Sequence, residues 1–298
     1  MTTLALYSLV PESALLQQCP AQLRKRFAVA LAAMHSHDGQ QLSWQQIAQQ
    51  AAISPFHFHR QFSQLFAEPP ARYLARQRLN AAVLNLLDYP HKSVTAIAHD
   101  CGYLSSQALA KAMQRQLGMT AKQLRALAQR ATLTQLTALL EKLGQPGSNQ
   151  PVEQQLAGQI IAKPEWLPQR YLRGKVATDF AWQRQLDKAP ALLQRMATLT
   201  PVAEAANALD SMTVIAGQLS SAAEAGAYTI NAGCYLTAQV RLTSALAYLA
   251  AWDRLYSQVQ QQGFIAEQSG YFIEQLLNYD ADSITLLLQL PVQPVGVN

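Results

Sequence analysis

The residues best suited to metal binding or to recognition of a partner lie within thirteen positions, 54–66. These positions hold four phenylalanines, two histidines and an arginine. The sequence there is SPFHFHRQFSQLF. Three structures fit such a run: a helix in the protein core, a metal site built on His57 and His59, or a surface that presents rings and a cation to a partner.

A helix that begins at this point divides the side chains between two faces. Ser54 is a favourable N-cap, and Pro55 is favourable at the first helical position. At about 100° per residue, one face is apolar and is expected in the core. It holds Phe58, Phe62, Leu65 and Phe66. The opposite face holds Phe56, His59, Arg60 and Ser63.

A metal site is not expected here. Two residues apart on a helix, His57 and His59 point about 200° away from each other and cannot share one ion. His35 and His37 have no Asp, Glu or Cys at ligand spacing. The sequence also has no G-x-S-x-G turn and no phosphate-binding loop, so we predict no cofactor and no enzyme.

The outward face of this helix has the side chains that contact DNA bases. Arginine bonds guanine edges or phosphate, histidine donates or accepts, and an apolar ring packs on thymine methyl groups. The alternative is a helix that tolerates one exposed phenylalanine, which is common.

The pattern occurs a second time about fifty residues later. IAQQAAIS at 47–54 is echoed by IAHDCGYLS at 97–105, each with a small residue at the turn and a serine before the next helix. Beyond the serines the offset is 51 residues. It pairs Phe58 with Leu109, Phe62 with Met113, Phe66 with Leu117 and Tyr73 with Leu124. Two helix-turn-helix patterns at a fixed offset are a far stronger signal than one.

The second unit offers a similar outward face. Ser105 is the expected cap, and Gln107, Lys111 and Gln114 share the side opposite Leu109, Ala112 and Met113. Glutamine suits adenine and lysine suits guanine or phosphate, while Ser106 lies at the helix N-terminus. A long helix carrying Arg72, Arg76 and Arg78 connects the units. We predict phosphate contacts by Ser63, Arg72, Arg76, Arg78, Gln114 and Arg115.

Charge separates the two halves of the 298-residue chain. Residues 1–150 contain 14 Lys and Arg against 6 Asp and Glu, and residues 151–298 contain 9 against 12. A basic half suggests a polyanionic partner, although basic residues also solvate ordinary surface helices. The N-terminus lacks the features of a signal peptide, and no apolar run is long enough to span a membrane. The three cysteines are far apart in the sequence and form no C-x-x-C pair. These features predict a cytoplasmic protein.

Periodicity predicts an all-α domain followed by an α+β domain. We expect an N-terminal extension at 1–19, a helical domain at 20–143, a linker at 144–152 containing GQPGSNQP, and a second domain at 153–298. Five expected strands in that domain cover 169–177, 212–219, 228–242, 271–278 and 284–292, with amphipathic helices at 179–196 and 243–263. The order of strands and helices predicts an internal duplication.

Residues 20–130 resemble the DNA-binding domain of the AraC/XylS family of bacterial transcription regulators. The run from RQRLNAA at 76–82 through IAHDCGY at 97–103 to LGMT at 117–120 carries the resemblance. It implies two helix-turn-helix units bridged by a helix, with double-stranded DNA as the partner. The family's base-contacting positions correspond to Phe56, His59 and Arg60, and to Ser106, Gln107 and Lys111. Ala52 stands where the first turn of the family often has glycine.

The second domain resembles the GyrI-like effector-binding module, through AWDRL at 251–255 and YFIEQLLN at 271–278. That resemblance implies a small lipophilic or cationic effector bound at Glu274, with Tyr271, Phe272 and Trp252 as an aromatic cage. Glu274 as a solvated strand residue and Trp252 as core are the alternatives. RNA polymerase is a further expected partner.

The predicted function is therefore a sequence-specific transcription regulator with an effector-binding second domain. Two other functions remain open on the sequence. One is a hydrolase or small-molecule binding protein with Glu274 as a general base in the second domain. The other is a non-specific DNA-coating protein.

Overall fold

The computed structural model describes residues 4–17, 19–35, 42–128, 130–177, 195–205, 207, 211–280 and 283–296. It divides into two compact units. Val10–Gln155 form the helical unit, and Met1–Leu9 together with Leu156–Asn298 form the sheet unit. The helix expected at 179–196 lies largely outside the described residues, as does His37. Among the described residues, no helix is long and apolar enough to cross a membrane.

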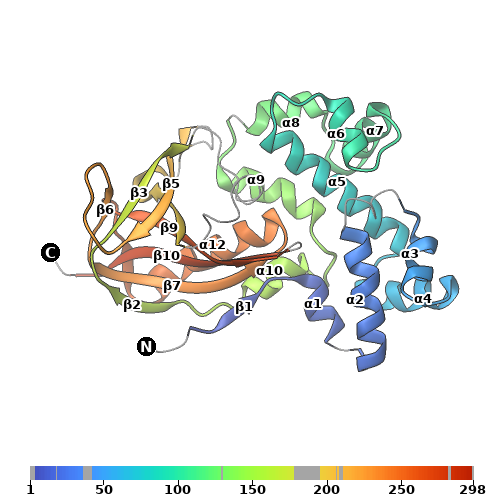
Figure 1. Ribbon diagram of the computed structural model, residues 1–298, viewed down its shortest axis with the longest axis horizontal. Coiled ribbons are helices and arrows are strands. Elements are labelled where there is room, and N and C mark those ends of the chain that lie inside the picture. The colour runs from blue at the N-terminus through green and yellow to red at the C-terminus, as the bar shows by residue number, and fades with distance from the viewer. Residues whose placement is uncertain are drawn as a thin grey trace. The chain divides into compact units, whose positions relative to one another are not determined.

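The helical unit consists of two helix pairs on either side of a long connecting helix (Figure 1). Within the described part of residues 20–143, helices follow one another as the sequence predicts. The helices are α1 (Pro11–Leu16), α2 (Ala21–His35), α3 (Trp44–Gln50), α4 (Pro55–Phe66), α5 (Pro70–Asp88), α6 (Val94–Asp100), α7 (Ser106–Leu117), α8 (Ala121–Ala128), α9 (Leu133–Leu140), η2 (Glu141–Leu143) and α10 (Val152–Ala157).

The fifty-residue repeat is confirmed by the burial of its paired positions. All eight side chains paired by the 51-residue offset are buried. In the first pair, Phe58, Phe62 and Phe66 form one core with Phe27 of α2, and the rings of Phe62 and Phe66 stack at 4.3 Å. Stacked rings bury a large apolar area, so this cluster holds α4 in place against its neighbours.

The two turns also match. Ala52 and Gly102 both adopt the left-handed backbone conformation, with φ of 54° and 76°. Glycine adopts this conformation without a steric penalty, whereas alanine does so at a cost. The small residues at these two turns therefore allow the chain to change direction between the paired helices.

The sheet unit contains a ten-stranded sheet in the order β1-β7-β10-β9-β4-β5-β3-β6, with β2 also paired to β7 and β8 to β10. The strands are β1 (Leu6–Ser8), β2 (Lys163–Leu167), β3 (Arg170–Ala177), β4 (Met196–Pro201), β5 (Val214–Ser220), β6 (Tyr228–Ile230), β7 (Gly233–Leu242), β8 (Phe264–Ala266), β9 (Tyr271–Tyr279) and β10 (Ile284–Pro294). The five expected strand regions correspond to β3, β5, β6 with β7, β9 and β10.

Helix α12 (Ala245–Gln261) packs on one face of the sheet, against β7 and β10 (Figure 1). Alternate residues of β10, such as Leu286, Leu288 and Leu290, point toward it and are fully buried. On the other face, Arg170 of β3 donates to Gln289 of β10 at 2.7 Å although three strands separate β3 from β10. The sheet therefore curls so that its two halves face each other around a second apolar cluster.

The first strand belongs to the sheet unit although it precedes the helical unit in sequence. β1 pairs in parallel with β7, with Leu6 opposite Gln239, and Leu9 N–H donates to the Arg241 carbonyl at 2.9 Å. The Leu9 side chain is fully buried in the same core as α12. The residues expected as an N-terminal extension are thus divided between the two units, and the helical unit is an insertion within the chain of the sheet unit.

Candidate nucleic-acid interface

Helix α4 begins as the sequence predicts. The Ser54 hydroxyl accepts a hydrogen bond from His57 N–H at 3.4 Å, and Pro55 occupies the first position. The phenylalanines at 58, 62 and 66 face the core, which leaves the opposite side to solvent. There, the Phe56 side chain is 79% exposed, and His59 and Arg60 are exposed beside it. The His59 ring lies 5.6 Å from the ring of Trp44, which limits its orientation.

Helix α7 presents the equivalent side. Ser105 accepts from Ala108 N–H at 3.2 Å, and Gly118 ends the helix in the left-handed conformation with φ of 73°. The exposed residues are Gln107, Lys111, Gln114 and Arg115, and Ser106 is half-buried. The structure therefore places the six predicted base-contacting residues on the outward sides or at the start of α4 and α7.

Not all of the predicted phosphate contacts lie where they can reach a phosphate. Arg72, Gln114 and Arg115 are exposed. The Ser63 hydroxyl oxygen, in contrast, is enclosed by protein atoms, which contradicts its prediction. Arg78 is half-buried and donates to the Leu42 carbonyl at 3.1 Å.

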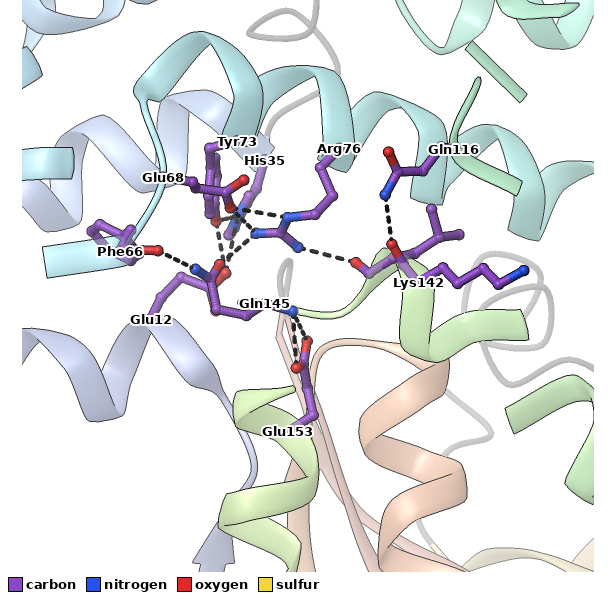
Figure 2. Close-up of polar contacts among 11 residues, drawn as sticks. Glu12, His35, Phe66, Glu68, Tyr73, Arg76, Gln116, Lys142, Gln145 and Glu153 are labelled. Atoms are coloured by element: carbon purple, nitrogen blue, oxygen red, sulfur yellow. Dashed lines mark hydrogen bonds and ion pairs between the residues drawn. The ribbon is translucent and has the colours of Figure 1, made fainter. Parts of the chain in front are cut away.

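Arg76 is the clearest correction. Its side chain is 9% exposed and forms an ion pair with Glu68 at 2.6 Å. It also donates to the Leu143 carbonyl at 3.1 Å and to the Gln145 side chain (Figure 2). Every nitrogen of this guanidinium is engaged inside the protein, so Arg76 is a structural residue and not a phosphate contact.

Around Arg76, a buried polar network joins segments that are distant in sequence (Figure 2). Tyr73 donates from its hydroxyl to Glu12 of α1 at 2.6 Å, and His35 lies 2.7 Å from the same hydroxyl. Burial, and then the Glu12 charge, raise the pKa of Tyr73 well above its usual value. The network joins α1 and α2 to α5 through side chains that no local pattern groups, since Glu12 and Tyr73 are 61 residues apart.

The segment after η2 continues this network. Gln145 donates from its side chain to the Phe66 carbonyl at 2.7 Å, and its backbone N–H donates to both carboxylate oxygens of Glu153, at 3.1 and 3.0 Å. Burial raises the pKa of Glu153 to about 7, although hydrogen bonds from the backbone of Glu153 itself and from that of Gln145 oppose the shift. The residues expected as a linker are therefore packed against the helical unit.

In the sheet unit, Glu274 forms the centre of a second candidate site. Its carboxylate is buried and accepts hydrogen bonds from the Tyr248 hydroxyl, from Trp252 Nε1 at 3.0 Å and from Thr198 Oγ1 at 3.2 Å. Burial, and then the Glu274 charge, raise the pKa of Tyr248 well above its usual value. Glu274 is thus not a solvated strand residue.

Only part of the predicted aromatic cage lies beside Glu274. Phe272 lies on the same face of β9 as Glu274, and its ring contacts that of Trp252 at 5.3 Å. Tyr271 lies on the opposite face because side chains alternate along a strand, and it packs in the second apolar cluster. Tyr248, one helical turn before Trp252, was not predicted. The i, i+4 spacing of these two aromatic residues on α12 is a signal in the sequence from which it could have been found. Among the described residues, no group of three or more His, Cys, Asp or Glu is placed to hold a metal ion.

The segment that contains the two helix pairs is similar to a known family of domains. Residues 47–127, from α3 into α8, match the family described as a helix-turn-helix domain. This segment of the chain is therefore a helix-turn-helix domain.

The curated relatives are transcription regulators. The chain is 39% identical over 80 residues to the HTH-type transcriptional regulator Rv1931c of Mycobacterium tuberculosis, which covers 27% of this chain and 30% of that protein. It is 35% identical over 95 residues to the HTH-type transcriptional activator RhaS of Escherichia fergusonii, covering 32% and 34%. The chain thus spans about a third of the length of the curated relatives it matches.

One solved structure similar to this chain is the DNA-binding domain of the transcription factor AdpA in complex with a target DNA. It has 31% sequence identity and a TM-score of 0.32, and covers 37% of this chain and 95% of that chain.

Proposed function

We propose that this protein is a sequence-specific, double-stranded DNA-binding transcription regulator of the AraC/XylS type. The observation that carries the proposal is the repeated geometry of α4 and α7. Each is the second helix of a helix-turn-helix pair, each is capped by a serine, and each presents base-compatible side chains on its solvent side. We refer to α4 and α7 as the recognition helices.

On α4, Phe56 packs against thymine methyl groups, while His59 and Arg60 bond base edges. On α7, Gln107 bonds adenine, Lys111 bonds guanine, and Ser106 contacts a base from the first turn of the helix. Arg72, Gln114 and Arg115 contact phosphates and position the domain without selecting a sequence. The basic balance of residues 1–150 supports a polyanionic partner.

Replacement of Arg60 tests the roles assigned to α4. Arg60→Ala weakens binding to a selected site by about 1–3 kcal/mol and relaxes base preference at one position, because a bidentate contact to a base edge is lost. The matched control is Lys25→Ala, which removes an exposed cation from α2. Affinities measured for the selected site and for its single-base variants show whether Arg60 contributes to affinity and to base preference. Unchanged affinity and preference in Arg60→Ala would remove this residue from the interface.

We further propose that the sheet unit binds a small lipophilic cation at Glu274. Support comes from a carboxylate that is buried among Tyr248, Trp252 and Phe272, because such a site offers both a negative charge and aromatic faces to a cation. As a transcription regulator, the protein is expected to act in the cytoplasm and to contact RNA polymerase.

Tetraphenylphosphonium, a lipophilic aromatic cation, is a suitable probe for this site. Titration into the full chain is expected to change tryptophan fluorescence in a saturable manner, and Glu274→Gln is expected to weaken binding at least about tenfold. Asp253→Asn, which neutralises an exposed carboxylate on α12, the helix of Tyr248 and Trp252, should bind the probe as the unaltered protein does. Equal binding by the Glu274→Gln protein would exclude Glu274 as the site.

A further inference from the structure

A cavity of about 820 Å³ lies within the helical unit. Its walls are the connecting helix α5, the recognition helix α7 and residues 141–151. This volume lies within the range of about 300–1,000 Å³ that is usual for small-molecule sites. Neither the helix-turn-helix geometry nor the Glu274 site requires such a space.

The third wall of the cavity is a fixed structure. Val152 N–H donates to the Gln145 carbonyl at 2.9 Å, and Gln155 donates from its side chain to the Gln150 carbonyl at 2.8 Å. Gly147 is packed so closely that a Cβ atom there would lie 2.2 Å from the Gln150 oxygen. The cavity is therefore bounded by a turn with defined internal contacts.

The charged groups around the cavity are predominantly cationic. Four cationic side chains face two carboxylates; these are Arg72, Arg76, Arg115 and Lys142 against Glu68 and Glu141. The ion pair between Arg76 and Glu68 neutralises one of each. Glu141 accepts a hydrogen bond from the Gln154 side chain at 2.5 Å. The remaining charges favour an anion, since three cations are left with one carboxylate.

Tyr103 also contributes to the wall, but its hydroxyl is enclosed by protein atoms and does not reach the open space of the cavity. Burial, with a smaller contribution from Cys101, raises the pKa of Tyr103 to about 12, so the hydroxyl keeps its proton at neutral pH.

We propose that this cavity binds a small organic anion. Its acidic group lies between Arg72 and Arg115, the two arginines assigned above to DNA phosphates, so that the ligand and DNA compete for them. Its apolar body packs against the alanine and leucine side chains of α5 and α7. The shape and charge of the wall select a carboxylate, phosphate or sulfonate carried on an apolar skeleton. Such a ligand contacts α5, α7 and the 141–151 turn at once.

The probe we choose is 1-anilinonaphthalene-8-sulfonate, an aromatic anion whose fluorescence increases on binding. Titrated into the full chain at fixed ionic strength, it is expected to show a saturable component. Ala75→Trp fills the cavity from α5, and Arg115→Gln removes one of its cations; each should weaken that component at least about tenfold.

Two matched variants control for an added ring and a lost charge outside the cavity. Ala126→Trp and Arg130→Gln alter exposed positions that do not line it, and both should titrate like the unaltered protein. Glu274→Gln should also retain the component, which separates this site from the sheet unit. Should Ala75→Trp fail to fold, Arg72→Gln at an exposed position replaces it. Titrations of Arg115→Gln and of the cavity-filling variant that match the unaltered protein would overturn the proposal.

Discussion

The guanidinium of Arg76 and the carboxylate of Glu68 form a buried ion pair at 2.6 Å. Among the described residues, only one carboxylate oxygen of Glu68 is bonded, and the other is enclosed without a partner. The pair therefore depends on Arg76 to neutralise a charge that water cannot reach. Because Arg76 also bonds Leu143 and Gln145, it links α5 to the segment that follows η2.

Removal of Arg76 should accordingly destabilise the protein severely. Arg76→Ala leaves Glu68 charged and unpaired, and we expect a loss of about 3–5 kcal/mol in the free energy of unfolding. Arg72→Ala, one turn earlier and exposed, should cost less than about 0.5 kcal/mol. Urea unfolding followed through the helical circular dichroism signal measures both. Similar stabilities for the two variants would contradict the assignment of Arg76 as a structural residue.

The two turns of the helix-turn-helix pairs predict opposite responses to a change at equivalent sites. Ala52→Gly should stabilise the protein by about 0.5–1 kcal/mol, because it removes the backbone strain of an alanine in the left-handed conformation. The greater conformational entropy of glycine in the unfolded chain offsets part of this gain. Gly102→Ala should destabilise it by about 1 kcal/mol, because it creates the same strain in the second turn. Thermal unfolding of the two variants tests this, and a loss of stability in Ala52→Gly would refute the strain at that turn.

Glu153 predicts how stability depends on pH. Its pKa is about 7 in the folded protein and near 4.5 when exposed to water, so the folded state holds this proton over a range in which the unfolded state releases it. The corresponding stabilisation is complete below about pH 4.5 and is lost as the pH rises to about 7. Glu153→Gln should therefore be more stable than the unaltered protein at pH 8, by about 1–3 kcal/mol, and equal to it near pH 4.

Unfolding measured at both pH values tests that sign. Glu204→Gln is a control in the sheet unit. A Glu153→Gln protein that is less stable at pH 8 would show that the ionised carboxylate stabilises the fold.

The N-terminal residues provide a further prediction. Leu9→Ala should cost about 2–5 kcal/mol of stability in the sheet unit, because this fully buried side chain packs in the core under α12. Leu6→Ala, three residues earlier on β1, is the matched control, since Leu6 is 52% exposed. Unfolding followed by the fluorescence of the sheet unit's tryptophans should be shifted by the first change and barely by the second. Equal shifts would mean that β1 is not part of that core.

The local signals in the sequence were sufficient to predict the recognition helices. Ser54 and Ser105 determine where α4 and α7 begin, and the i, i+4 spacing of Phe58 and Phe62 determines which side is buried. These signals act within one helix, so they are visible without knowledge of the fold.

Features that depend on distant pairing were not predictable in the same way. Strand β1 has three residues, and its partner β7 lies more than 220 positions later, so nothing local indicates a strand there. Arg76 looks like any other arginine on a basic helix until Glu68 and Gln145 are brought beside it. Tyr271 was misplaced because the aromatic cage was inferred from neighbours in sequence, whereas adjacent residues on a strand point to opposite faces.

Selection of bound DNA from a random pool by the full chain, at moderate salt, tests whether α4 and α7 both read a DNA sequence. We predict enrichment of a motif with two conserved parts whose centres are separated by about one helical turn, ~34 Å, because α4 and α7 each enter a major groove. Binding that enriches no sequence, and that falls steeply with salt, would contradict it and would show that the two helices hold DNA by charge alone.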